Sequence, residues 1–223
     1  MAPKASRVPK TPTAPTQASR AFDRWAATYE QSPLQTFLFG HAHKAVLRCL
    51  GTMTPAATLV DVGCGTGRLL RRIASLWPGC ALIGVDPSPQ MIETARALSP
   101  GITFYVGGAE DVPVLSGEAA VVTSTISFHH WTDRERGVRE AYRILRPEGH
   151  LVLVDLAGPP WLARILGDPP YGGIKERNEI LGRVGFTGIH HESVVHPYLL
   201  RTSAEKGPYR GISRPAATGE DHR

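Results

Sequence analysis

Three glycines and a carboxylate lie in the first strongly apolar segment of the 223-residue sequence, where their spacing could bind a ligand. The segment 59–67 reads LVDVGCGTG and holds Asp61, Gly63, Gly65 and Gly67. Glycines at this spacing permit a tight turn and let a ligand approach backbone amides closely. If a helix follows, its amino end favours a carboxylate or a phosphate. The alternative is a turn that contains glycine for packing alone.

A second carboxylate, Asp86, closes the next apolar run, 19 residues after Gly67. An acid at the end of a second strand can accept both hydroxyls of a ribose, although it could instead cap the following helix. A nicotinamide dinucleotide loop would read Gly-x-Gly-x-x-Gly, which this segment does not, and Asp61 would face a pyrophosphate unfavourably. Asp61 better suits a ligand that carries an ammonium group beside its carboxylate. A ligand with a ribose and an amino-acid end but no phosphate is S-adenosylmethionine.

Two histidines at the end of a later apolar run could activate a methyl acceptor. Methyl transfer is an in-line displacement on an activated sulfonium, so holding the acceptor in line supplies much of the rate. A base is needed only where the acceptor is a hydroxyl or an acidic carbon. His129 and His130 are the candidate bases, with a structural role as the alternative for each, and Asp155 is expected to be structural or to orient the substrate. No metal site is predicted, because no histidine pair has cysteines at zinc spacing.

Alternating strand-like and helix-like segments must position these residues. Helical periodicity at 21–50, divided by Pro33, predicts two helices before the first strand. Ser88 is expected to cap a later helix, and Thr132 with Glu135 to form a capping box for the next. Strands are predicted at 57–63, 81–86, 102–107, 119–127 and 150–156, and helices at 67–77, 88–98, 132–145 and 174–184. Two further runs, at 186–195 and 197–203, could pair as an antiparallel edge.

This alternation predicts an α/β fold: a Rossmann-like, seven-stranded, mostly parallel sheet with helices on both faces and an antiparallel last strand. Such sheets bind ligands outside the carboxyl ends of the strands, at the switch point, and each motif above falls at such an end. Residues 20–205 are predicted to form one domain, in which 20–50 are capping helices. Residues 1–19 and 206–223 are predicted to be disordered tails.

The distribution of charge and the number of cysteines limit which classes of partner and which cellular compartment are expected. The net charge of +5 arises in the tails, because residues 21–205 hold 17 Lys and Arg against 18 Asp and Glu. A nucleic-acid groove would need basic residues on the folded face, so no nucleic-acid partner is expected. No apolar run approaches the roughly 18–20 residues that span a bilayer, so no membrane partner is expected. The three cysteines match no metal spacing and are predicted to be reduced thiols in the cytoplasm.

The chain resembles the class I S-adenosylmethionine-dependent methyltransferases, in the group that contains quinone-type and small-molecule C- and O-methyltransferases. The likeness covers roughly residues 20–200, and its motifs are specific for the cofactor and the fold but not for the substrate. It is carried by LVDVGCGTG at 59–67, GVDPSPQMI at 84–92, GGAEDVPV at 107–114, SFHHWTD at 127–133 and EAYRILRPEGHLVLVD at 140–155. The segment FDRWAATYEQS, at 22–32, resembles the capping helix of the family.

The resemblance implies S-adenosylmethionine as the cofactor and adds four residues to its predicted site: Tyr29, Ala109, Glu110 and Ser127. Tyr29 corresponds to the lid tyrosine that reaches the methionine end, and the Ala109 amide is expected to meet the adenine ring. The third turn of the family usually reads Gly-Asp-Ala-Glu, with the Asp receiving the adenine amino group. Gly108 replaces that Asp here, so the bond is either missing or supplied by Glu110 or Asp111.

One motif points to different chemistry. The box Asp168-Pro169-Pro170-Tyr171 resembles the signature of enzymes that methylate exocyclic amino groups of DNA bases. In those enzymes the box ends the fourth strand, whereas here it follows the fifth and the segment 127–133 occupies its place. The box is therefore interpreted as a coincidence.

The sequence thus predicts S-adenosylmethionine-dependent methyl transfer to a small, partly apolar acceptor, at oxygen, carbon or nitrogen. The expected partner is a small-molecule methyl acceptor. Two alternatives stay open: a non-catalytic module that binds the cofactor, and an NAD-dependent oxidoreductase.

Overall fold

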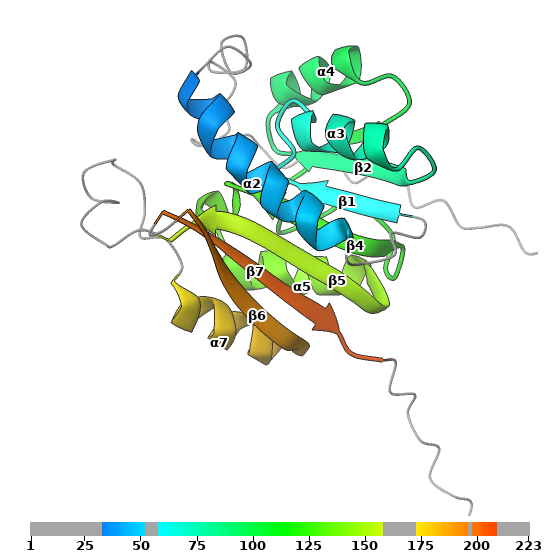
Figure 1. Ribbon diagram of the computed structural model, residues 1–223. Coiled ribbons are helices and arrows are strands. Elements are labelled where there is room, and N and C mark those ends of the chain that lie inside the picture. Colours follow the sequence, from blue (N-terminus) through cyan, green and yellow to red (C-terminus); the bar gives the residue numbers. More distant parts are fainter. Residues whose placement is uncertain (1–32, 52–57, 158–172, 196–197, 209–223) are drawn as a thin grey trace, which may run out of the picture.

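One mixed sheet organises the parts of the chain that the computed structural model describes, which are residues 33–51, 58–157, 173–195 and 198–208. Its strand order is β3-β2-β1-β4-β5-β7-β6 (Figure 1). β7 pairs antiparallel with both β5 and β6, while the other pairs are parallel, which confirms the predicted fold class. The strands are β1 (Thr58–Val62), β2 (Ala81–Asp86), β3 (Thr103–Val106), β4 (Ala119–Thr125), β5 (Leu145–Leu156), β6 (Phe186–Val195) and β7 (Leu199–Lys206).

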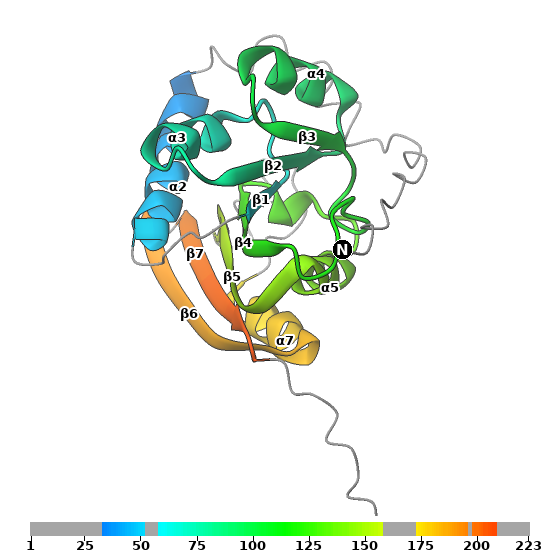
Figure 2. The ribbon, with the colours of Figure 1, turned by 90° about the vertical axis from the view of Figure 1, so that its right-hand side faces the viewer.

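Helices cover both faces of this sheet. Figure 1 shows α2 lying across β4, β5 and β7, with α5 behind the sheet, and Figure 2 shows α5 and α7 together on the face opposite α2. The helices are α2 (Pro33–Gly51), α3 (Arg68–Leu76), α4 (Pro89–Leu98), α5 (Arg134–Ile144) and α7 (Ile174–Val184), with a short 3₁₀ helix, η1, at Phe128–His130.

The two faces of the sheet pack into two separate hydrophobic cores. Leu59 of β1 faces the core that includes apolar residues of α2, α3 and α4, whereas Val60 and Val62 face the core that includes those of α5 and α7. This alternation follows from the two-residue period of a strand. β4 is buried at every position, as expected for a central strand of a sheet covered on both faces.

Most predicted boundaries agree with the structure, and two need correction. Ser88 caps α4 by accepting a hydrogen bond from the Met91 amide, as predicted. Asp133, not Thr132, caps α5, because its side chain accepts from the Arg136 amide at 2.9 Å. β5 begins at Leu145, five residues before the predicted start, and contains the predicted turn at 146–149 as an irregularity in its pairing with β4.

Several predicted features lie outside the described residues. These are Tyr29 with the first capping helix, the box at 168–171, and most of both predicted tails. The domain boundaries at 20 and 205 therefore stay a prediction, although β7 continues to Lys206. Among the described residues, no helix has both the length and the apolar character needed to cross a membrane.

Candidate active site

The glycine turn after β1 is tied to the end of β2. Gly63, Gly65 and Gly67 have φ angles of 77°, 52° and 78°, a region that residues with a side chain rarely adopt. The Gly63 amide donates to the Val85 carbonyl at 2.8 Å, and the Gly65 amide donates to Oδ2 of Asp86 at 2.9 Å. These amides are therefore used to hold the turn against β2, so the turn and the Asp86 carboxylate form one unit.

The same turn also contacts the end of β4. A Cβ atom added to Gly63 would lie 1.9 Å from Oγ of Ser127, so only glycine allows this approach. Ser127 Oγ in turn accepts a hydrogen bond from Nε1 of Trp131 at 3.3 Å. Ile126, which precedes Ser127, has a φ of 50°, an unfavourable angle for a β-branched residue. Strained backbone of this kind clusters at functional sites, and here it falls at the switch point between β1 and β4.

Asp61 brings a buried carboxylate to the end of β1. It lies directly opposite Thr123 of β4 and accepts that hydroxyl at Oδ1, at 2.8 Å. Oδ2 is buried and has no hydrogen-bond partner among the described residues. Burial, together with the nearby charge of Asp86, raises the pKa of Asp61 to about 7, although the Thr123 hydrogen bond acts in the opposite direction. An unpaired buried acceptor of this kind is costly, so it marks a position where a cationic donor would be strongly favoured.

Asp86, at the end of β2, is held in a fixed orientation. Its Oδ2 accepts the Gly65 amide, and its Oδ1 accepts the Ser88 amide at 2.9 Å. The side chain that caps α4 is Ser88 rather than Asp86, so the capping alternative does not account for the carboxylate. The two amides hold the carboxylate at the edge of the sheet where β2 ends.

The turn after β3 places Ala109 and Glu110 beside the same edge. The Gly107 amide donates to the backbone carbonyl of Asp86 at 3.0 Å, which fixes the turn next to the end of β2. Ala109 is buried. Glu110 reaches across to α5, where its Oε1 accepts the amide of Asp133 at 3.1 Å. The structure therefore brings this turn, the glycine turn and Asp86 together.

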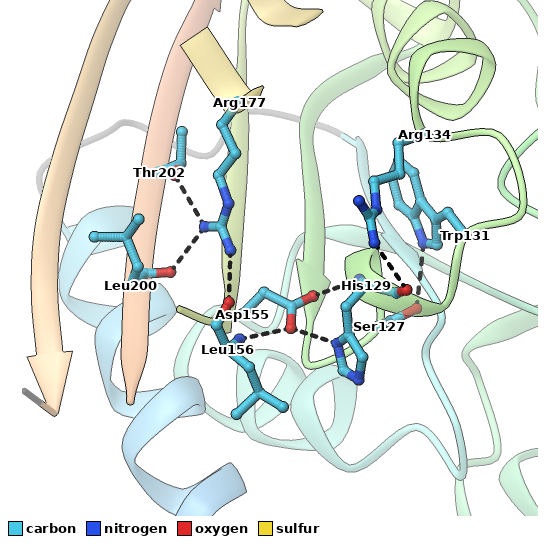
Figure 3. A network of polar contacts seen from close by, with 9 residues as sticks. All are labelled: Ser127, His129, Trp131, Arg134, Asp155, Leu156, Arg177, Leu200 and Thr202. Atoms are coloured by element: carbon cyan, nitrogen blue, oxygen red, sulfur yellow. Dashed lines mark hydrogen bonds and ion pairs between the residues drawn. The ribbon is translucent and has the colours of Figure 1, made fainter. Parts of the chain in front are cut away.

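On the other side of the switch point, His129 forms a buried pair with Asp155. Nδ1 of His129 lies 2.6 Å from Oδ1 of Asp155, and the His129 amide donates to Oδ2 at 3.1 Å (Figure 3). The Leu156 amide donates to Oδ1 as well. Because the carboxylate can only accept when ionised, Nδ1 carries a proton, and in the neutral ring Nε2 therefore carries the lone pair. Asp155 thus fixes both the position and the tautomer of the ring.

Arg177 compensates the buried charge of Asp155. Its side chain, 1% exposed, extends from α7 and donates to Thr202 Oγ1, the Leu200 carbonyl and the Leu156 carbonyl, at 3.1–3.2 Å (Figure 3). Burial alone would raise the pKa of Asp155, but the hydrogen bond and charge of His129, the charge of Arg177 and the Leu156 amide together lower it. Asp155 therefore stays ionised at neutral pH.

Aromatic and cationic groups surround this pair. The rings of His129 and His130 lie 3.8 Å apart, and the guanidinium groups of Arg134 and Arg177 lie 5.8 and 5.7 Å from the Phe128 ring centre. His130 is only partly buried. Of the two candidate bases, His129 is the one that a buried acid orients. Within the described ranges, no group of three or more His, Cys, Asp or Glu side chains is arranged to hold a metal ion.

The structure brings together the predicted residues Asp61, Gly63, Gly65, Gly67, Asp86, Ser127 and His129 at one edge of the sheet, with Ala109 and Glu110 at its β3 end. Sequence reasoning missed Thr123 and Arg177. Thr123 lies in a segment that was predicted as a strand, and it pairs with Asp61. Aligning the two predicted strands side by side could have identified it. Arg177 had no such signal, because an arginine in a surface helix is normally exposed.

Comparisons with known proteins agree with this fold. Residues 60–153 match the family model of a methyltransferase domain. An uncharacterized methyltransferase of Mycobacterium tuberculosis is 35% identical over 135 residues, which are 60% of this chain and 51% of that protein. A demethylmenaquinone methyltransferase of Thermotoga maritima is 30% identical over 152 residues, 67% of this chain and 66% of that protein. The chain thus spans about half the length of the first of these relatives and about two thirds of the second.

A solved structure shows the same fold over a larger part of the chain. A Haloferax volcanii methyltransferase, in complex with a methyltransferase activator, superposes with a TM-score of 0.69 at 23% identity, over 83% of this chain and 97% of that one. The matched segment 60–153 contains the glycine turn, Asp86 and His129, and it ends just before Asp155. The chain belongs to the class I S-adenosylmethionine-dependent methyltransferases.

Proposed function

We propose that this protein binds S-adenosylmethionine and transfers its methyl group to a small, partly apolar acceptor. The observation that carries the proposal is the buried, unpartnered Oδ2 of Asp61 beside the ribose-type carboxylate of Asp86. The cofactor supplies a methyl group on a sulfonium, which is already activated for displacement. Its ammonium group fits the unpartnered oxygen of Asp61, and its ribose hydroxyls are proposed to donate to the Asp86 carboxylate at the end of β2.

Other residues complete the cofactor site in this proposal. Gly63 permits the close approach of the turn to Ser127, and Gly67 permits close contact of the turn with the Phe104 ring. The Ala109 amide and the Ser127 side chain remain predicted contacts. Tyr29, outside the described residues, remains the predicted lid residue.

His129 is proposed as the general base on the acceptor side. Nε2, with its lone pair directed by the Nδ1–Asp155 bond, removes the proton from the acceptor, while the acceptor oxygen or carbon forms the new bond to the methyl group. The bound cofactor would supply the methyl group and keep the electron pair of the broken C–S bond, and the acceptor's proton would stay on His129. The positive charge that leaves the sulfonium is thus replaced by one on the imidazolium, which ionised Asp155 stabilises.

This arrangement favours acceptors that must lose a proton, such as phenols, hydroquinones or other weakly acidic groups. The Thermotoga maritima relative is a demethylmenaquinone methyltransferase, which supports the hydroquinone class. The proposal includes no nucleic-acid or membrane partner. It also includes a cytoplasmic location, since the three cysteines form no disulfide.

Two measurements test the proposal. Calorimetry should show that the protein binds S-adenosylhomocysteine and does not bind NADH. A screen with radiolabelled methyl donor should then show transfer to phenols or hydroquinones in preference to amines. Binding of NADH with no binding of S-adenosylhomocysteine would contradict the assignment of the crevice. Cofactor binding without transfer to any acceptor class would favour the non-catalytic alternative.

A further inference from the structure

His191, on β6, is hydrogen-bonded to both β7 and α7. Its Nδ1 lies 3.0 Å from Oγ1 of Thr202 on β7, and its Nε2 lies 2.9 Å from Oδ1 of Asn178 on α7. An amide oxygen only accepts, so Nε2 carries a proton and, in the neutral ring, Nδ1 accepts the Thr202 hydroxyl. The ring is therefore held at both nitrogens, and the Asn178 oxygen selects its tautomer.

A continuous series of hydrogen bonds connects this ring to the candidate base. Oγ1 of Thr202 accepts Nη1 of Arg177 at 3.1 Å, and Nη2 of Arg177 donates to the Leu156 carbonyl at 3.1 Å (Figure 3). The amide of the same Leu156 donates to Oδ1 of Asp155 at 2.6 Å, and that oxygen lies 2.6 Å from Nδ1 of His129. A change at Thr202 therefore reaches the carboxylate through Arg177 and one peptide group.

Protonation of His191 would reverse the direction of the first bond in this series. In the neutral ring, the Thr202 hydroxyl donates to Nδ1 and keeps its oxygen lone pairs for Arg177. In the protonated ring, Nδ1 donates instead, so Oγ1 accepts from two cations and its own hydrogen loses this acceptor. The two positive charges, separated by one hydroxyl, also repel each other. The two states of the ring thus have opposite effects on the bond that holds Arg177.

The surroundings of the His191 ring favour its neutral state. Burial, the charge of Arg177 on α7 and the charge of the adjacent His190 on β6 all lower the pKa of His191. The side chains bonded to the ring from β7 and α7, Thr202 and Asn178, carry no charge. The ring therefore takes up its proton only in acid, below about pH 6. The bond between Thr202 and Arg177 is intact at neutral pH and weakened in acid.

We propose that His191 is a positioning residue for methyl transfer: its neutral ring orients the Thr202 hydroxyl that holds Arg177, and its protonation in acid weakens this hold and slows the reaction. This inference rests on the proposed role of His129 as the base. The alternative is that His191 only fastens α7 to the sheet. Its loss would then lower the stability of the protein without changing how the rate depends on pH.

Two substitutions at position 191 separate the hydrogen bond from the proton. In His191→Asn, the amide oxygen replaces Nδ1 as the acceptor but does not titrate, so kcat at about pH 8 should stay within about threefold of the parent. In His191→Phe the acceptor is lost, so kcat at about pH 8 should fall by about three- to tenfold, with KM for S-adenosylmethionine unchanged. Between about pH 7 and pH 5, kcat should fall more steeply in the parent than in His191→Asn.

His190→Asn is the matched control. His190 is the preceding residue of β6, it is exposed, and it points to the opposite face of the sheet. Its substitution should leave kcat at about pH 8 and the steep fall in acid as they are in the parent. A fall in acid that is equally shallow in the two Asn variants would contradict the proposal, and so would an unchanged kcat in a folded His191→Phe protein.

An NMR titration of the unaltered protein requires neither a variant nor a methyl acceptor. The imidazole signals of His129 should shift in two steps, one of which coincides with the titration of His191. That step should be absent in His191→Asn and present in His190→Asn. A single step at His129 would overturn the inference even where methyl transfer is observed. If no acceptor class is methylated, the proposed function and the effect on rate both fail, and the NMR titration alone decides whether the two imidazoles are linked.

Discussion

The two halves of the crevice are built in opposite ways. On the β1-β2-β3 side, two carboxylates and two tight turns lie within 50 residues of one another, from Asp61 to Glu110, and the buried Oδ2 of Asp61 is left unpartnered. On the β4-β5-β7 side, His129 is bonded to Asp155, and the charge of Arg177, which is held by Thr202, favours the ionised form of that carboxylate. The first half is organised for a ligand that brings its own donors. The second half is organised to keep one imidazole in a defined state.

This difference has a physical reason. A cationic ligand group stabilises an open buried acceptor, so the cost of Asp61 in the ligand-free protein is recovered on binding. A general base needs its hydrogen-bond partner already in place, because its tautomer and position must be correct before the acceptor binds. Substitutions in the cofactor half should therefore mainly change the affinity for the cofactor. Substitutions in the acceptor half should mainly change the free energy of unfolding and the rate of methyl transfer.

The largest expected effect on the cofactor half comes from Asp86→Ala. Removing the acceptor of two ribose hydroxyls should cost about 3–6 kcal/mol, which is a hundredfold or greater loss of affinity for S-adenosylhomocysteine. Calorimetry measures it, and Glu93→Ala, an exposed change on the adjacent α4, is the control. Retained micromolar affinity in a folded Asp86→Ala protein would contradict the ribose role.

The corresponding change in the acceptor half is Asp155→Asn. It leaves Arg177 buried without its counter-charge, which should lower the free energy of unfolding by about 3–5 kcal/mol and the melting temperature by about 6–15 °C. Because the pKa of Asp155 is lowered, its contribution is present at neutral pH and lost as the pH falls below about 4. The difference between parent and variant should therefore shrink in acid.

The double variant Asp155→Asn/Arg177→Met separates stability from chemistry. Removing the buried cation as well should recover part of the melting temperature. Methyl transfer should stay low, because nothing then fixes the proton on Nδ1 of His129. Recovery of the rate together with the stability would show that Asp155 acts only as a structural partner of Arg177.

Asp61→Asn should move stability and binding in opposite directions. The pKa of Asp61 is raised to about 7, so between about pH 4 and pH 7 the folded protein holds a proton that the unfolded chain has lost. The free energy of unfolding therefore falls as the pH rises through this range. The variant should therefore be more stable than the parent at pH 8, by roughly 2–4 kcal/mol, and similar to it near pH 4. Thermal melts across this range measure the change.

Cofactor binding by the same variant gives the complementary test. In the parent, affinity for S-adenosylhomocysteine should rise between pH 6 and 8 as Asp61 ionises, and this slope should be absent in Asp61→Asn. A variant that loses stability at pH 8 and keeps the pH slope would exclude Asp61 as the ammonium partner.

The smallest effect is expected at Gly108. In the parent background, Gly108→Asp places a second carboxylate near Oε2 of Glu110, and should weaken S-adenosylhomocysteine binding by about 0.5–1.5 kcal/mol. In the Glu110→Ala background the same change should strengthen binding, because the new acid then has the space to itself. An effect of the same sign in both backgrounds would mean that the two positions are independent.

The same contrast explains what could be predicted from sequence. The cofactor half was predictable because its residues sit at the ends of consecutive strands, in glycine patterns whose conformation is local. His129 was predicted as a candidate base from its position after β4. The sequence could not distinguish it from His130, because only the structure shows the contact with Asp155. Arg177 could not be predicted, because its burial depends on the packing of α7 against β7.

The placement of β7 between β5 and β6 has a consequence for protein synthesis. The hydrogen bonds that hold Arg177 come partly from Leu200 and Thr202, among the last residues of the fold to leave the ribosome. The ribosome releases β1, β2 and β3 earlier. A nascent or truncated chain without β7 would therefore lack the acceptors that hold Arg177 near Asp155 and His129.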